Sequence, residues 1–126
     1  MDELIGRITQ SLGVDAGGAH QAIGLILNFL KKEGPQAEVD QLLNNIPGSE
    51  EAIATAPQGG GGLMGAFGGM MGGGLMGLAG QLQGLGLGMG EIQGLGKELF
   101  AYGKEVVGED TMGQIAGAIP GLDQFV

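Results

Sequence analysis

Apolar residues recur at helical spacing through the first third of the chain. Over residues 2–12 they follow one helical face, as expected for an amphipathic helix. Over residues 16–32 they form two stripes, which predicts a central helix buried on two sides. The positions are Leu4, Ile5, Ile8 and Leu12 in the first helix, and Ala19, Ala22, Ile23, Leu25, Ile26, Leu27, Phe29 and Leu30 in the second.

Capping and breaking residues mark where these helices begin and end. Asp15 is placed to cap the second helix, and Gly34-Pro35 is expected to end it after Lys31 and Lys32. A third helix is expected over residues 36–44. Pro47-Gly48 then breaks the chain before a short helix of residues 49–56, for which Ser49 is the expected cap.

The same pattern returns after residue 90. Ile92, Leu95, Leu99 and Val106 predict a helix over residues 90–107. A last helix is expected with Thr111 as its cap, its apolar positions being Met112, Ile115 and Ala116. Pro120-Gly121 is expected to end that helix.

Two parts of the chain align without a gap at an offset of 73 residues. Residues 12–53 lie on residues 85–126, with eight identical pairs among 42 and Ile-Pro-Gly shared at 46–48 and 119–121. The apolar positions also agree. This pattern predicts a structural duplication in which each half buries its apolar face against the other.

The fold class expected from these patterns is all-α. The chain is predicted to form a helical bundle from two pseudo-symmetric repeats, residues 1–56 and 75–126, joined by a Gly/Met-rich segment of residues 57–74. The first helix needs a counterpart before residue 85. Residues 75–83, LMGLAGQLQ, are the candidate, because Leu75, Leu78 and Leu82 fit one helical face.

Two stretches of the chain resemble a known family. The resemblance is stronger in QIAGAIPGLDQFV and weaker in LGVDAGGAHQAIGLILNF. A leucine-glycine start, a long helix rich in small residues and a short helix ending in Ile-Pro-Gly resemble the VcgC/VcgE-type bacterial proteins of unknown function. The resemblance covers the two repeats and not the glycine tract. It implies a small helical domain without assigned chemistry, so it transfers no functional residue.

The segment joining the repeats is the most unusual part of the sequence. No charged residue occurs between Glu51 and Glu91, and glycine and methionine dominate residues 59–80. On a helix, two rows spaced by four residues would form a smooth glycine ridge and an apolar row beside it. The ridge is Gly61, Gly65, Gly69, Gly73 and Gly77, and the row is Leu63, Phe67, Met71 and Leu75.

Three interpretations of this segment stay open. A flexible linker explains the glycines but not the many apolar side chains. A packed glycine-zipper helix or hairpin must offset about 1 kcal/mol per glycine relative to alanine. A membrane segment has the required length of about 20 residues, but no Lys or Arg flanks it closely and no aromatic belt is present.

The amino-acid composition limits the kinds of partner that the protein can bind and the chemistry that it can carry out. The net charge is −9, from 14 acidic and 5 basic residues, which argues against binding to nucleic acid. The absence of cysteine excludes disulfides and thiolate metal sites. The acidic, amphipathic start of the chain does not resemble a secretory signal, so the expected location is cytoplasmic.

No residue pattern points to catalysis, a metal or a cofactor. His20 is the only histidine, and a lone histidine lacks the partners that a metal or catalytic site needs. Three paired carboxylates, Asp2-Glu3, Glu50-Glu51 and Glu109-Asp110, stand where helices begin and are explained by the helix dipole. The GxGxxG match at residues 60–65 has neither the preceding strand nor the following acid of a dinucleotide site.

The sequence therefore predicts a non-enzymatic structural or interaction protein without a small-molecule substrate. It is expected to self-associate through its glycine-rich apolar segment, as a homo-oligomer or with a protein partner, because so apolar a surface needs cover. The alternative is a small membrane-associated or pore-type protein that inserts residues 59–80.

Overall fold

The computed structural model describes residues 2–55, 75–119 and 122. Within these ranges the chain forms seven helices and no strand. They are α1 (Asp2–Leu12), α2 (Ala16–Glu33), α3 (Gln36–Asn44), α4 (Ser49–Thr55), α6 (Leu75–Gly84), α7 (Met89–Val107) and α8 (Glu109–Ala118). The predicted all-α class is confirmed.

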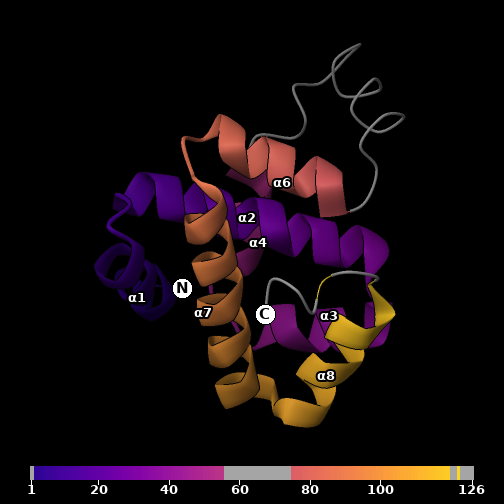
Figure 1. The fold of residues 1–126 in the computed structure, drawn as a ribbon. Helices are drawn as coiled ribbons and strands as arrows, with labels where there is room; N and C mark the ends of the chain where they lie inside the picture. The colour runs from indigo at the N-terminus through magenta and orange to yellow at the C-terminus, as the bar shows by residue number, and fades with distance from the viewer. Residues whose placement is uncertain (1, 56–74, 120–121, 123–126) are drawn as a thin grey trace.

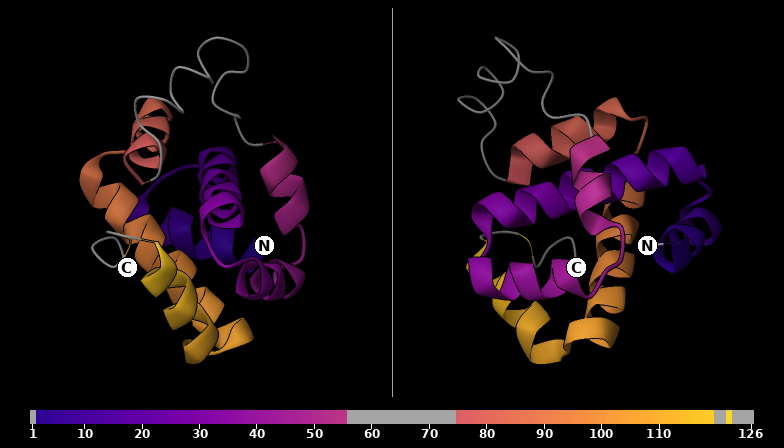
Figure 2. Two further views of the ribbon diagram at one scale, coloured as in Figure 1. Left: turned by 90° about the vertical axis from the view of Figure 1, so that its right-hand side faces the viewer. Right: turned by 180° about the vertical axis from the view of Figure 1, so that it is seen from behind.

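In the view of Figure 1, the long helix α7 passes in front of the long helix α2. Helix α2 packs against α1, α3, α4 and α6, whereas α7 packs against α1, α3, α6 and α8. Figure 2 shows α4 along the back of α2, on the side away from α7. Being covered on several sides explains why α2 needs two apolar stripes.

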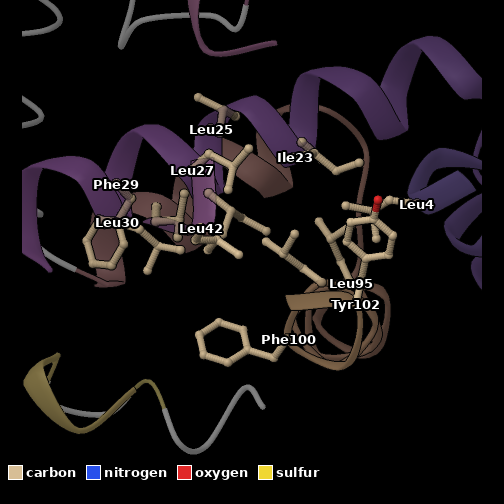
Figure 3. Close-up of a cluster of buried hydrophobic side chains, with 14 of the residues drawn as sticks. Leu4, Ile23, Leu25, Leu27, Phe29, Leu30, Leu42, Leu95, Phe100 and Tyr102 are labelled. Carbon is tan, nitrogen blue, oxygen red and sulfur yellow. The ribbon is translucent and has the colours of Figure 1, made fainter. Parts of the chain in front are cut away.

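One cluster of buried side chains joins the helices. Figure 3 shows side chains of α1, α2, α3 and α7 converging in it. Leu4, Ile23, Leu27, Leu42 and Leu99 are among its members with no more than traces of exposed surface. Helix α6 adds Leu78 and Leu82, and α8 adds Met112 and Ile115. A core that draws on distant parts of the chain makes the described helices a single packed unit.

Most predicted helix ends are confirmed. Helix α2 ends with Lys31 and Lys32 in its last turn, just before Gly34-Pro35. The three acidic pairs occupy the first turns of α1, α4 and α8, where carboxylates interact favourably with the helix dipole. A helix, α6, forms over residues 75–84, where residues 75–83 are expected to be helical. Pro120-Gly121 lies outside the described residues.

Three predicted caps are corrected. Asp15 occupies the N-cap position of α2, but its carboxylate makes no capping hydrogen bond and lies instead over Gly18. Thr111 lies inside α8, which begins two residues earlier at Glu109, with Gly108 in the N-cap position. The positive φ of Gly108 (97°) turns the chain sharply between α7 and α8, so the helix starts before Thr111.

Ser49 is the third correction. It is buried, and its hydroxyl donates a hydrogen bond of 2.8 Å to the carbonyl of Leu43 rather than capping α4. That carbonyl belongs to the last turn of α3, where helical carbonyls lack partners within the helix. Ser49 therefore ties the start of α4 to the end of α3.

Candidate interaction site

Most residues of the predicted interaction site fall outside the described part of the chain. These are Gly61, Gly65, Gly69, Gly73, Leu63, Phe67 and Met71. Leu75 and Gly77 lie in the first turn of α6. The described ends on either side of the segment, Thr55 in α4 and Leu75 in α6, open on the same side of the molecule (Figures 1 and 2).

The described helices expose few large apolar side chains. Among the described residues, Met89 is the one large hydrophobic side chain that is well exposed, at 49%. Its sulfur accepts a hydrogen bond of 3.3 Å from Nε2 of Gln83. Most apolar side chains whose burial the structure describes thus pack into the core or against it.

Among the described residues, polar side chains join α1 to α7 across a long separation in sequence. Arg7 donates hydrogen bonds to both carboxylate oxygens of Glu105, the one from Nη2 being 3.2 Å long. Nη2 also donates to Glu3, one turn earlier in α1, at 3.2 Å. The guanidinium lies over the ring of Tyr102, with Cζ 5.6 Å from the ring centroid, within the range of a cation–π interaction.

This pairing changes the electrostatics of both partners. The hydrogen bond from Arg7 holds the pKa of the Glu105 carboxyl below its ordinary value. The same bond raises the pKa of Arg7. Nearby, the hydroxyl of Ser11 donates a hydrogen bond of 3.3 Å to a carboxylate oxygen of Glu98. Arg7 is the only arginine in the chain, and its fork of donors suits a carboxylate bound through both oxygens.

The α1–α7 pairing predicts a specific pH dependence. The folded pKa of Glu105 is depressed, so its stabilising effect is present above the unfolded pKa and is lost as the pH falls through the folded pKa. We expect Glu105→Gln to lower the melting temperature slightly at pH 7 and to have no effect near pH 2. Thermal denaturation across this pH range measures the difference.

The control for this prediction is the same measurement at high salt concentration. Exposed ion pairs are weakened at high ionic strength, so the difference between Glu105→Gln and wild type at pH 7 should shrink in 1 M NaCl. A difference that persists unchanged in 1 M salt, or at pH 2, would contradict an electrostatic origin.

The residues considered for catalysis are not brought together. Ser11 bonds Glu98 on α7, and buried Ser49 bonds a main-chain carbonyl. His20 lies partly exposed in α2, and no described acid or hydroxyl is hydrogen-bonded to its ring. Across the described ranges no three His, Cys, Asp or Glu side chains gather as metal ligands. The described residues thus provide no assembled catalytic or metal-binding group.

None of the described helices is both long enough and apolar enough to cross a membrane. Two residues of the segment considered for insertion, Leu78 and Ala79, are buried against the helical body. Comparison of the chain with protein-family models, curated proteins and solved structures finds no match.

Proposed function

We propose that this chain is a non-enzymatic interaction protein whose two related helical units display a glycine-rich segment for self-association. The observation that carries the proposal is the burial of the apolar side chains that the structure describes, among which Met89 is the one large hydrophobic residue that is well exposed. The apolar side chains of residues 59–74 would find little matching surface on these helices. A second copy of the segment supplies both an apolar row and a glycine ridge.

The helix boundaries support the proposed duplication. Helices α1, α2 and α3 begin at residues 2, 16 and 36, and α6, α7 and α8 begin at 75, 89 and 109. Each pair is separated by the offset of 73 that aligns the sequences. The glycines at the end of the first helix of each half, Gly13 and Gly86, both have positive φ, at 73° and 94°. That conformation favours glycine.

Several local hydrogen bonds also recur at the same offset. The amide of Ala19 donates to the carbonyl of Asp15, and the amide of Ile92 donates to that of Gly88, both at 2.9 Å. The amide of Ser49 donates to the carbonyl of Ile46 at 3.1 Å, and the amide of Leu122 donates to the carbonyl of Ile119 at 3.2 Å. Both isoleucines of the Ile-Pro-Gly motifs are buried. These equivalences favour two copies of one structural unit over a chance alignment.

The pattern of helix contacts supports the same proposal. Helix α1 of the first half packs on α7 of the second, and α6 of the second half packs on α2 of the first. Helices α3 and α8, which correspond to each other, are also in contact. Reciprocal contacts of this kind are expected when two related units pack about a pseudo-twofold axis.

The glycine ridge provides the test of self-association. We expect wild type to form a single oligomer in size-exclusion chromatography with light scattering, and Gly69→Leu to dissociate it, because a leucine at this position prevents close approach of two helices. The matched control is Gly68→Leu, which adds the same side chain one residue away from the ridge. An oligomer that survives both substitutions equally would show that the segment is only a tether.

The same experiment separates the alternative function. If the protein is recovered only with detergent and sediments with vesicles, the membrane-associated interpretation of residues 59–80 is favoured. Leu78 and Ala79 already have buried places on the helical body, so inserting the whole segment requires α6 to leave α2. Self-association needs no such loss of packing.

A further inference from the structure

Met89 is the first residue of α7 and lies just after the turn that joins α6 to α7. Among the methionines whose burial the structure describes, Met89 is exposed and Met112 is buried. We infer that Met89 is a site of reversible oxidation by peroxides, at which the side-chain amide of Gln83 directs the incoming oxygen to one side of the sulfur. This modification concerns described residues only and is independent of the proposed self-association.

The surroundings of the Met89 side chain are open to a small oxidant. The residue is 49% exposed. Its neighbours along the chain, Gly88 and Gly90, have no side chains, and a Cβ built at either position would meet no atom within 4 Å. The same holds for Gly84 and Gly86, at the end of α6 and in the turn. Because a peroxide must reach the sulfur to react with it, this exposure favours oxidation of Met89.

The reaction transfers two electrons from the sulfur to the peroxide. A lone pair of the Met89 sulfur attacks one oxygen of hydrogen peroxide, so that an S–O bond forms while the O–O bond breaks. The departing oxygen takes the electron pair of the O–O bond and the proton of the transferred oxygen, and it leaves as water. The thioether is thereby oxidised to a sulfoxide, which methionine sulfoxide reductases convert back to the thioether.

Gln83 makes the two sides of this sulfur different. Its Nε2 donates a hydrogen bond of 3.3 Å to Sδ of Met89. A thioether sulfur has two lone pairs, and the addition of oxygen to one or the other gives the two opposite epimers of the sulfoxide. Because the amide of Gln83 occupies one lone pair, the other lone pair is free to attack the peroxide. Oxidation of the folded protein is therefore expected to give one epimer in excess.

Met112 provides an internal reference for this reaction. Its side chain is fully buried in α8, and its Sδ lies only 2.6 Å from the position that a Cβ would take at Gly103 of α7. A sulfoxide at Met112 would place a polar oxygen in the core, which is unfavourable without a hydrogen-bond partner. At Met89 the added oxygen is in contact with water. The helical core can therefore stay intact while Met89 is oxidised and reduced.

Limited oxidation of the full-length protein tests the site. We expect hydrogen peroxide to add an oxygen atom to Met89 at least about tenfold faster than to Met112. Mass spectrometry of proteolytic peptides, with fragmentation to locate the added oxygen, measures both rates. Equal rates at the two residues, or faster oxidation of Met112, would overturn the inference.

The ratio of the two epimers tests the role of Gln83. The folded protein is oxidised and digested, and its peptides are treated with either of the two reductases, each specific for one sulfoxide epimer. In wild type we expect one epimer of the Met89 sulfoxide in about two- to fivefold excess, as a single weak hydrogen bond would give. In Gln83→Ala we expect nearly equal amounts, because both lone pairs are then free.

The matched control is Gln81→Ala, which removes the same kind of exposed side chain from α6. The hydrogen bond to Met89 comes from Gln83, so Gln81→Ala should keep the excess found in wild type. Equal amounts of the two epimers in wild type, or an unchanged excess in Gln83→Ala, would show that Gln83 does not direct the oxidation.

Discussion

Replacing Leu27 with alanine is expected to destabilise the protein by about 3 kcal/mol. Leu27 lies in α2 and is fully buried in the core (Figure 3). Removing its branched end loses apolar burial and leaves a cavity that the surrounding helices fill only in part. A small domain is typically stable by about 5–15 kcal/mol, so this loss is a large fraction of the total.

Urea denaturation followed by far-ultraviolet circular dichroism measures this effect. The midpoint should fall while the slope stays constant, because the surface exposed on unfolding hardly changes. Met89→Ala is the control, since Met89 is the exposed large hydrophobic residue in the described part. We expect that control to stay within about 0.5 kcal/mol of wild type. A loss below about 1 kcal/mol for Leu27→Ala would contradict a packed centre.

The triple substitution Gly6→Ala, Gly80→Ala, Gly113→Ala is expected to stabilise the protein by about 1.5–3 kcal/mol. These glycines lie inside α1, α6 and α8. A Cβ added at any of them meets no atom within 4 Å. Alanine therefore reduces the backbone entropy lost on folding without a steric cost. The three sites lie on different helices, so their effects should add.

The matched control is Gly103→Ala, which makes the same chemical change where the buried Met112 side chain would have to shift. A Cβ at Gly103 would lie 2.6 Å from both Sδ and Cε of Met112, whose side chain is fully buried. Overpacking a core typically costs about 1–3 kcal/mol. The midpoint of urea denaturation should thus rise for the triple variant and fall for the control. A destabilised triple variant would contradict the open surroundings of these glycines.

Local patterns in the sequence were enough to predict the helices. The apolar period of 3.6 placed α2 and α3, and Gly34-Pro35 marked the boundary between them. The alignment at an offset of 73 also placed α6, whose glycines and lack of charge give a poor helix signal on their own. Caps were harder to predict, because Ser49 and Thr111 suit several positions near a helix start.

Contacts between the halves could not be predicted in the same way. Arg7 and Glu105 are separated by 98 residues, and no local spacing relates them. The one local sign was Glu3 four residues before Arg7, which predicts a pair within α1 and not a bond to α7. For the candidate interaction site, the glycine ridge and the apolar row beside it remain a prediction at the seven positions outside the described residues.

The contact between Arg7 and Tyr102 gives the protein a natural optical probe. The chain has one tyrosine and no tryptophan, so its near-ultraviolet absorbance and its intrinsic emission come chiefly from a single phenol. That phenol is buried in α7 beneath the guanidinium of α1. Emission from Tyr102 therefore reports on the seating of α1 without any label.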